Sequence, residues 1–475
     1  MGNLARTSYD LPDLYYNTTY FWKIKATDNH GSWTQGSQWD FMTATPNTSP
    51  STHDQAIAAY IDTPKDIALE ANDSEGDSLR YFIVQGPSYG MLSGVPPIVT
   101  YTPNTGFKGK DSFTFRVNDG QADSNIATVT TYVWTQPQRL DSTGGAEPTL
   151  SYAPNGDLRV FYNIGDTTNN HMVVRTRLNA QTVFGLETFV YDDAHTAAVH
   201  YDTSGKLDLA VNTDDYITIL QSLNGGNTWD LIKTYPNRNF PPVDSKDLRL
   251  CFTQDNSATL RLFYNYVNSA MITTFCVQTV KRINNVWEGN PLGLGCNQYN
   301  VFVGAHENGD KVTAFSYGAV FHSQNNGATY NLIRFDGLNL SWAQDIAVDS
   351  AGRMYYVFPS SNNISLRYSD DNGTTWSGRH AIVQCPNGVK NLRLAIDGDR
   401  MVVVWQISDF PQHLQCIVSE DGGESWSNIM PLVSLAEPNQ LVVNDLESYG
   451  GRFTLGYSVL RGQAREGTYL MEFSF

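Results

Sequence analysis

The chain has 475 residues, which is too long for one ordinary hydrophobic core and predicts about two to four domains. Its 31 Lys and Arg against 48 Asp and Glu give a formal net charge of −17, which argues against a nucleic-acid partner. Aromatic residues make up 12% of the chain, and segments rich in Thr, Tyr, Val and Phe alternate with Gly, Asn and Asp turns, so we expect an all-β protein.

The N-terminal part of the chain, residues 1–46, carries strand-like, aromatic-rich segments at 15–28 and around Trp33. These segments resemble the last three strands of a fibronectin type III domain, and the step from Leu11 to Tyr20 resembles that family's tyrosine corner. The resemblance implies a partial β-sandwich whose first half is missing. Because the exposed edge of such a domain needs a cover, we expect homo- or hetero-assembly through it.

A polar linker at 47–51 precedes a second unit at 52–134. Its landmark segments are 69–77, 79–81, 101–103, 106–109, 111–113 and 117–120. Their order resembles bacterial Ig-like and cadherin-like repeats of large surface proteins. The resemblance implies a β-sandwich that serves as a stalk module.

Acidic residues cluster at one end of this Ig-like unit. Asp73, Glu75 and Asp77 alternate on one turn, and Asp119 lies on a separate Asp-Gly turn that could approach them. Hard oxygen ligands of this kind suit calcium, so one reading is a Ca²⁺ site. The other reading is a solvated acidic turn, and the sequence leaves both open.

Four copies of one eight-residue pattern lie in the remaining segment, residues 135–475: SLNGGNTW at 222–229, SQNNGATY at 323–330, SDDNGTTW at 369–376 and SEDGGESW at 419–426. A short acidic or amide side chain can accept backbone N–H bonds and hold a tight turn, Gly allows a backbone conformation that other residues resist, and the aromatic residue can pack between sheets. The pattern resembles the Asp box, the bacterial-neuraminidase repeat of sialidase-like β-propellers. Its structural positions are Ser222, Asn224, Gly226, Trp229, Ser323, Asn325, Gly327, Tyr330, Ser369, Asp371, Gly373, Trp376, Ser419, Asp421, Gly423 and Trp426.

Small hairpin turns recur between apolar strands at steps of about 43 to 52 residues, which is the period of a four-stranded propeller blade. They lie at 155–156, 204–205, 256–257, 308–309, 351–352, 398–399 and 450–451. Seven units predict a seven-bladed propeller, with six blades, as in sialidases, as the alternative. We expect residues near 131–140 to supply the last outer strand and so to close the ring.

In such a ring the boxes lie on one face, so a ligand would bind at the loops of the opposite face. Carboxylates, aromatic rings and Arg in those loops suit a sugar ligand. The candidates for catalysis are Asp193, Asp215, Tyr216, Glu147 and Arg461. The candidates for ligand binding are Asp166, His171, His195, Tyr299, Trp342, Asp345, Asp409, His413 and Arg465.

The residues do not select one reaction. A glycosidase needs two opposed carboxylates, or a Tyr nucleophile helped by a carboxylate as in sialidases, whereas a uronate lyase needs a His/Tyr pair and an Arg. Sialidases carry a Phe/Tyr-Arg-Ile-Pro stretch near the first blade, and this sequence has none. The sialidase-like resemblance therefore implies the fold and not the activity, and whether the chain is an enzyme stays open.

Three functions follow as hypotheses. The first is a secreted or cell-surface protein whose propeller recognises a glycan or another surface component, with the β-sandwiches as a stalk. The second is a carbohydrate-active enzyme, a glycoside hydrolase or polysaccharide lyase, and the weaker third is a structural protein of a surface layer or filament. No apolar run approaches the roughly 20 residues of a membrane helix, and we expect an export signal upstream of this sequence.

The five cysteines, Cys251, Cys276, Cys296, Cys385 and Cys416, are too few and odd in number for a disulfide framework. Cys276 could pair with Cys296, or Cys385 with Cys416. Buried free thiols are the alternative that we favour.

Overall fold

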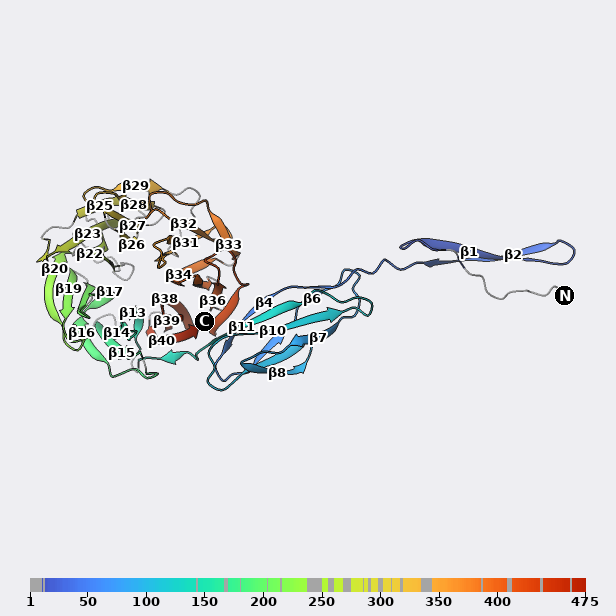
Figure 1. Cartoon of the computed structure of the whole chain (residues 1–475), viewed down its shortest axis with the longest axis horizontal. Coiled ribbons are helices and arrows are strands. Elements are labelled where there is room, and N and C mark those ends of the chain that lie inside the picture. The colour runs from blue at the N-terminus through green and yellow to red at the C-terminus, as the bar shows by residue number, and fades with distance from the viewer. Residues whose placement is uncertain are drawn as a thin grey trace. The chain divides into compact units, whose positions relative to one another are not determined.

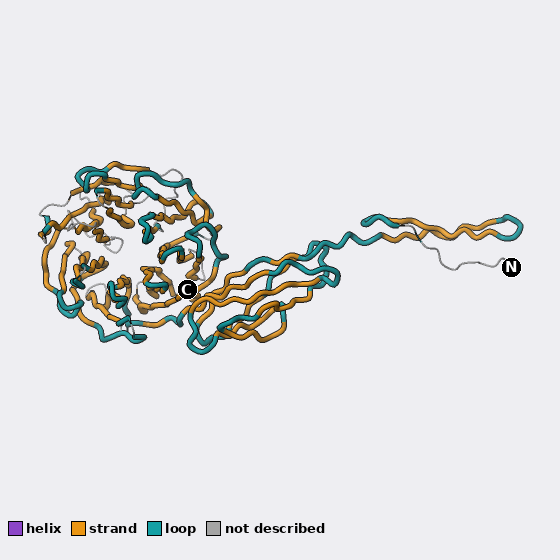
Figure 2. Tube along the Cα trace, in the orientation of Figure 1, coloured by secondary structure: helices purple, strands orange, loops and turns teal. Residues whose placement is uncertain are grey.

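The structure is a computed structural model that describes residues 11, 13–141, 144–165, 170–179, 181–202, 204–213, 216–236, 250–254, 260–267, 275–284, 286–288, 292–297, 302–308, 310–316, 319–334, 344–385, 388–407, 412–435, 439–461 and 464–475. Over these residues the chain is built of strands and loops, without a helix (Figure 2). The described part therefore contains no helix long and apolar enough to cross a membrane. The all-β prediction is confirmed.

Contacts divide the chain into two compact units, which we describe separately. The first unit comprises Met1–Gln55, Lys65–Thr102 and Ser112–Thr130, and the second comprises Ala56–Pro64, Pro103–Asp111 and Thr131–Phe475.

The first unit begins with an antiparallel hairpin of β1 (Thr19–Thr27) and β2 (Trp33–Met42). Trp22 and Trp39 lie opposite each other, with ring centroids 4.6 Å apart, and both rings are nearly half exposed. The hydroxyl of Tyr20 accepts a hydrogen bond from Tyr15 N at 2.8 Å. Two strands are described here where the sequence predicted three, and a two-stranded hairpin alone is only marginally stable in water.

Two antiparallel sheets then form the Ig-like domain. One has the order β4 (Gln55–Tyr60), β11 (Ala127–Trp134), β10 (Gly109–Asn118), β7 (Arg80–Gln85), the other β5 (Lys65–Ala68), β9 (Ile98–Pro103), β8 (Gly90–Val95), and β3 (Ser51–Thr52) pairs with β6 (Ala71–Asn72). Burial alternates along β10, as expected of a strand with one face on a core. The buried residues of this domain within the first unit include Ile67, Leu69, Val99, Tyr101, Phe113, Phe115 and Val117.

The second unit contains seven antiparallel sheets in its described residues, which we number in chain order. Sheet 1 is β13 (Ala146–Tyr152), β14 (Leu158–Gly165), β15 (Asn170–Arg177) and β16 (Thr188–Asp192). Sheet 2 is β17 (Ala194–Tyr201), β18 (Leu207–Thr213), β19 (Tyr216–Ser222) and β20 (Asp230–Pro236). Sheet 3 is β21 (Leu250–Gln254), β22 (Leu260–Val267), β23 (Phe275–Ile283), β24 (Val286–Trp287) and β25 (Leu292–Asn297).

Sheet 4 is β26 (Phe302–Asn308), β27 (Lys311–Ser316), β28 (Ala319–Ser323) and β29 (Asn331–Arg334). Sheet 5 is β30 (Asp345–Val348), β31 (Met354–Ser360), β32 (Asn363–Ser369) and β33 (His380–Gln384). Sheet 6 is β34 (Val389–Asp397), β35 (Arg400–Ile407), β36 (Gln412–Ser419) and β37 (Met430–Leu435). Sheet 7 is β38 (Asn439–Tyr449), β39 (Arg452–Arg461), β40 (Ala464–Ser474) and β12 (Gln138–Arg139).

The sheets are arranged in a ring (Figure 1). The first strand of each sheet contacts the first strand of the next, in the cyclic order β13, β17, β21, β26, β30, β34, β38 and back to β13. Apolar residues fill the space between neighbouring sheets; Phe161 and Met172 of sheet 1, for example, share a buried cluster with Leu209 and Leu220 of sheet 2. The core is thus divided among the interfaces between sheets.

The ring is closed by a strand near the start of the segment Thr131–Phe475 of the second unit. In sheet 7, β12 pairs with β40, so that Gln138 lies opposite Leu470. On either side of this pair, Thr135 N donates to Glu472 O at 2.8 Å and Leu140 N donates to Thr468 O at 2.9 Å. The expectation that residues near 131–140 supply the last outer strand is confirmed.

The four repeated segments form stapled turns between the third and fourth strands of sheets 2, 4, 5 and 6. In sheet 5, Ser369 Oγ donates to Asp371 Oδ1 at 2.9 Å, Gly373 N donates to Ser369 Oγ at 2.8 Å, and Thr375 N donates to Asp371 Oδ1 at 2.8 Å. The same three bonds recur in the other three segments. A short polar side chain therefore holds each turn by accepting main-chain N–H bonds.

The aromatic residue of the turn packs against the preceding sheet. The Trp376 ring meets Phe315 of sheet 4 edge-on at 5.5 Å, and the Trp229 ring meets Phe161 of sheet 1 at 6.1 Å. The indole N–H groups of these two tryptophans differ in whether they donate a hydrogen bond. Trp376 donates to Gly373 O at 3.1 Å, whereas the Trp229 Nε1 is buried without a hydrogen-bond partner among the described residues.

A second set of bonds joins each of three turns to the sheet before it. Arg159 on β14 donates to Gly225 O of sheet 2 at 3.0 and 3.2 Å. Arg261 on β22 donates to the Asn326 carbonyl and side-chain oxygens of sheet 4 at 3.2 and 2.8 Å, and Lys311 on β27 donates to Asp371 O of sheet 5 at 3.0 Å. In a tight turn, some main-chain carbonyl groups have no hydrogen-bond donor within their own sheet. These three side chains donate to such carbonyl groups.

Cys385 and Cys416 are buried and free, so they do not form a bridge. Burial raises the pKa of the Cys416 thiol, which keeps this thiol protonated and unreactive. The side chains of Cys251, Cys276 and Cys296 lie outside the described residues.

We predict that Arg261→Met destabilises the ring. Met fills a similar space but donates no hydrogen bond, so the substitution leaves the Asn326 carbonyl unsatisfied and should lower the free energy of unfolding by about 1–3 kcal/mol. Urea unfolding checks this. Lys281→Met, which removes a partly exposed 3.5 Å pair with Glu288, is the control and should cost less than about 1 kcal/mol; equal losses for the two variants would contradict the role given to Arg261.

Candidate functional site

The two faces of the ring are distinguished by the stapled turns. Asn326 N of a stapled turn donates to Asp310 O in the turn between the first two strands of the same sheet, and Gly422 N and Asp399 O repeat this bond in sheet 6. Both kinds of turn therefore lie on one face, which we call the stapled face. The connections between second and third strands, and the crossings between sheets, lie on the other face, which we call the open face.

Described candidate residues lie at strand ends of the open face. Those at the crossings or at the starts of first strands are Glu147, Asp193, His195 and Asp345, and those beside the connections of second and third strands are His171, Tyr216, His413, Arg461 and Arg465. Asp166, Asp215, Tyr299, Trp342 and Asp409 lie outside the described residues.

The first strands are irregular where these candidates lie. The pairing register shifts between Ala146 and Thr149 in β13 and between Ala194 and Thr196 in β17, and sheets 4, 6 and 7 carry shifts in their first strands as well. Such bulges leave a residue unpaired and turn its side chain in a new direction. Glu147 has a φ of 59°, a left-handed conformation that costs free energy in a residue other than glycine.

Hydrogen bonds fix the bulged residues across three sheets. Glu147 N donates to Ser458 Oγ at 2.9 Å, and Ser458 Oγ donates to Asn444 Oδ1 at 2.8 Å. Asn163 Nδ2 donates to Glu147 Oε2 at 3.1 Å and to His195 O at 2.6 Å. Sheets 7, 1 and 2 thus share a polar belt, defined by these five residues, in which Asn163 and Ser458 are buried.

Asp193 lies beside the belt in the crossing from sheet 1 to sheet 2. Its N–H donates to Asn170 O at 2.7 Å, and the side chain of Asn170 donates to Ala194 O at 2.5 Å. Arg465 of sheet 7 donates to Asn170 Oδ1 at 2.7 Å. Asn170 is buried, whereas Asp193 is exposed at a φ of 54°. Two sheets therefore hold the backbone of an exposed acidic residue in a strained conformation.

Other candidates are less closely joined. His171 Nδ1 lies 2.5 Å from Asp192 Oδ1, and His413 Nδ1 lies 2.6 Å from Ser434 Oγ. Tyr216 is 47% exposed and Arg461 is exposed. No described contact joins these two residues to each other or to the belt, so the structure does not assemble them into one site.

Asp345 has a contact that sequence reasoning missed. Asp345, Arg393 and Asp445 occupy the same register on the first strands of sheets 5, 6 and 7. Asp345 Oδ2 accepts a bond from Leu394 N at 2.9 Å, and Asp445 Oδ2 accepts one from Leu150 N at 2.7 Å, in each case on the first strand of the next sheet. These carboxylates thus satisfy main-chain N–H groups next to the bulges, and we assign Asp345 this structural role.

Glu447 lies two residues beyond Asp445 on β38, and both side chains are half-buried. Burial, followed by the charges of Asp445 and Asp345, raises the pKa of Glu447 well above its ordinary value. Burial raises the pKa of Asp445 to about 6, with the Asp345 charge acting in the same direction and Leu150 N and Arg393 opposing it. Carboxyl groups of the first strands therefore hold protons at pH values where exposed carboxyl groups have lost them.

The acidic turn of the Ig-like domain binds its own backbone and the linker. Asp73 Oδ1 accepts bonds from Glu75 N at 3.1 Å and Asp77 N at 2.8 Å. Bonds from the Thr48 and Ser74 hydroxyls lower the pKa of Glu75. In the described part of the chain, no three His, Cys, Asp or Glu side chains are grouped to hold a metal.

Asp119 acts in the same way on the neighbouring turn. Its Oδ1 accepts bonds from Ala122 N and Gln121 N, both at 2.7 Å, and its Oδ2 accepts one from Asn47 Nδ2 at 2.9 Å. These bonds lower the pKa of Asp119. Carboxylates from both turns therefore tie down the linker that precedes the domain.

Comparison with known proteins identifies part of the chain. Residues 43–132 match the family model of the bacterial Ig domain, which confirms an Ig-like domain there. A search of curated proteins gives no match.

The solved structures to which this chain is similar include the following three. A YCF48 protein bound to a D1 peptide is 14% identical over 72% of this chain and 97% of its own, with a TM-score of 0.44. The polysaccharide lyase Uly1 is 10% identical over 68% and 88%, with a TM-score of 0.44, and the Hadza microbial sialidase Hz136 is 11% identical over 80% and 76%, with a TM-score of 0.36. At these values the similarities carry no argument about activity or ligand.

We predict that Glu447→Gln stabilises the ring at neutral and higher pH. The folded state raises the pKa of Glu447, so the folded protein binds this proton more tightly than the unfolded chain does, and stability is lost as the pH rises above about 4.3, the unfolded value. Gln carries no proton to lose. The variant should therefore exceed the parent by at least about 1 kcal/mol at pH 8, with the difference shrinking toward pH 5.

Urea unfolding at pH 5, 6.5 and 8 measures this difference. Glu424→Gln, at an exposed position of the sheet 6 turn, is the control and should track the parent at all three pH values. Parallel pH profiles for Glu447→Gln and the parent would refute the assignment of the buried proton.

Proposed function

We propose that the second unit is a seven-bladed Asp-box propeller that recognises a glycan at its open face. The Ig-like domain, preceded by a partial fibronectin-like hairpin, serves as its stalk, and the whole protein works outside the cell or at its surface. The stapled turns, the closed cycle of first strands and the bacterial Ig domain support this reading.

The observation that carries the proposal is the backbone conformation of Asp193 and Glu147 and the hydrogen bonds that hold it. Both are acidic residues in left-handed backbone conformations on the open face, and both are held by hydrogen bonds from neighbouring sheets. A conformation that costs free energy persists when surrounding structure enforces it, and such residues cluster at ligand sites. Carboxylates are good acceptors for sugar hydroxyls, and the half-exposed Tyr216 offers a ring for stacking.

A carbohydrate-active enzyme is the second candidate. Asp193 and Glu147 are its candidate groups, because hydrolysis of a glycosidic bond uses a pair of carboxyl groups. Glu147 is already bonded to Asn163, and a residue fixed in this way suits binding as well as catalysis. We therefore place recognition first.

We predict that Asp193→Asn weakens glycan binding. The amide loses the negative charge and half of the acceptor capacity, so array signals should fall about tenfold or more. A glycan array run beside assays for reducing ends and unsaturated uronates on the same polysaccharides measures both candidate functions. Asp230→Asn, an exposed position on the outer strand β20, is the matched control and should bind as the parent does.

The outcomes separate the hypotheses. Binding without product release supports recognition, whereas product release that Asp193→Asn abolishes establishes the enzyme instead. If Asp193→Asn binds glycans as well as the parent does, the part of the open face around Asp193 is not the binding site.

A calcium ion at Asp73, Glu75, Asp77 and Asp119 stays a prediction. If it binds there, EDTA should lower the melting temperature of the Ig-like domain, because the metal stabilises only the folded state. Adding Ca²⁺ back should restore it, and Asp73→Asn should abolish both effects. A melting temperature that does not respond to EDTA or Ca²⁺ would eliminate the metal and leave these carboxylates their role as acceptors for the linker.

A further inference from the structure

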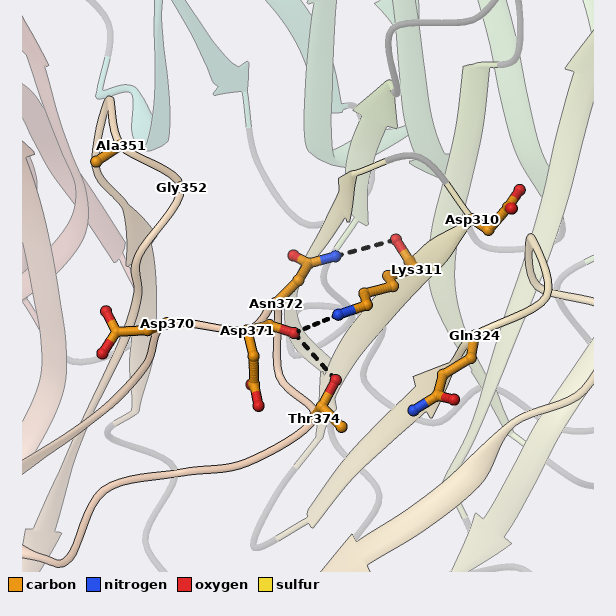
Figure 3. A pocket seen from close by; sticks show the side chains of 9 residues that line it. All are labelled: Asp310, Lys311, Gln324, Ala351, Gly352, Asp370, Asp371, Asn372 and Thr374. Carbon is orange, nitrogen blue, oxygen red and sulfur yellow. Dashed lines mark hydrogen bonds between the residues drawn. The ribbon is translucent and has the colours of Figure 1, made fainter.

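A polar pocket of about 680 Å³ lies on the stapled face between sheets 4 and 5 (Figure 3). Sheet 4 contributes Asp310, Lys311 and Gln324, and sheet 5 contributes the remaining lining residues: Ala351, Gly352, Asp370, Asp371, Asn372 and Thr374. A volume of this size accommodates a small ligand such as one or two sugar residues. The pocket is separate from the open face and its polar belt.

Most of the charge around the pocket is already balanced. Arg353 Nε lies 2.5 Å from Asp370 Oδ1, and Lys311 donates to the main-chain oxygen of Asp371 at 3.0 Å, beside the Asp371 carboxylate. Asp310 is exposed, and its carboxylate makes no hydrogen bond or ion pair with the described residues. The pocket therefore offers one uncompensated negative charge.

Asn372 forms part of the floor and is only 6% exposed. Figure 3 shows its side-chain nitrogen turned toward Lys311 O, a bond of 3.2 Å. Its Oδ1 is buried with no hydrogen-bond partner among the described residues. This oxygen has almost no accessible surface, so it belongs to the packed layer beneath the pocket and is not a contact point for a ligand.

Side chains of sheet 4 hold the backbone of Asn372 and the side chain of Thr374 in place. Thr313 Oγ1 donates to Asn372 O at 2.9 Å and lies 3.0 Å from His322 Nδ1, whose Nε2 lies 3.4 Å from Thr374 Oγ1. A Cβ added to Gly373, whose φ is +84°, would lie 2.7 Å from Thr313 Oγ1. The close approach of the two sheets therefore depends on glycine at this position.

The lining selects the kind of ligand. Among the described residues, no aromatic side chain and no large aliphatic one lines the pocket, so these residues offer neither ring stacking nor burial of an apolar stem. Two exposed side chains of the lining, the Asp310 carboxylate and the Gln324 carboxamide, offer acceptors, whereas the Lys311 ammonium already donates to Asp371 O. These acceptors match a compact body that carries hydroxyl groups and one positive charge, whereas a lysine side chain would place its methylene stem against polar atoms.

We propose that this pocket binds an amino sugar, with the protonated amine at Asp310 and a hydroxyl group at Gln324. It is a second glycan subsite, on the face opposite the one proposed above, and it depends on the proposed function only in taking a sugar as the body of the ligand. The positive charge of the amine is the specificity element, because Asp310 is the carboxylate left unpaired.

Glucosamine, N-acetylglucosamine, glucose and Nα-acetyl-lysine amide, titrated into the full chain and followed by NMR or calorimetry, test this. Glucosamine should bind, and acetylation or removal of its amine should weaken binding about tenfold or more, because an ion pair with Asp310 is lost. Asp310→Asn should cause the same loss. Asp399→Asn is the matched control, since Asp399 is exposed and occupies the corresponding turn of sheet 6, and it should leave binding unchanged.

Other outcomes overturn the proposal. If glucosamine and glucose bind equally, or if Asp310→Asn binds glucosamine unchanged, the proposed ion pair with Asp310 is excluded. If Nα-acetyl-lysine amide binds as tightly as glucosamine, the pocket does not require a sugar. Asp193→Asn separates this subsite from the open face: it should leave glucosamine binding intact even where it abolishes array signals. Conversely, a chain that binds no array glycan but binds glucosamine through Asp310 refutes the open-face site alone.

Discussion

Hydrogen bonds between neighbouring sheets are the interaction on which the ring depends. A β-sheet satisfies its own main-chain groups along its length, but a tight turn or a bulge leaves N–H and C=O groups without partners, and such groups are costly when buried. Here the partner comes from the adjacent sheet. Arg261 serves the turn of sheet 4, and Asp345 and Asp445 serve the bulged first strands of sheets 6 and 1. Each of these turns and bulges is thus bonded to a neighbouring sheet, and these bonds fix the orientation of neighbouring sheets relative to one another.

This arrangement explains how a ring of separate sheets can present fixed side chains. Asn163 joins sheets 1 and 2, and Arg465 of sheet 7 holds Asn170 of sheet 1. An exposed residue beside such bonds, as Asp193 is, has its backbone fixed by neighbours that are themselves buried. A rigid scaffold with functional groups at its loops lowers the entropy lost on binding. The open face is therefore suited to recognition because of the same bonds that stabilise the fold.

The sequence predicted well what is local. Ser, Asx and Gly in the repeated segments make the turn bonds that their chemistry predicts, and the hairpin spacing indicated seven units where the described residues form seven sheets. The contacts between sheets were not predictable, because Arg261 and Asn326 are 65 residues apart and nothing in either segment marks the other. For the same reason Glu447 drew no attention, since its raised pKa arises from burial and from carboxylates on other parts of the chain. Register shifts in the first strands, which set the direction of Glu147, leave no clear mark in the apolar pattern.

Closure of the ring by β12 is the central structural claim, since an open ring would leave β40 as a free edge and would not fix sheet 7 against sheet 1. Native-state hydrogen exchange read by mass spectrometry tests it most directly. The account predicts that the amides of Thr135 and Leu140 exchange as slowly as those of β40 and open together with them, because both N–H groups are bonded to that strand. Exchange of these two amides at the rate of an exposed loop, while β40 stays protected, would contradict it.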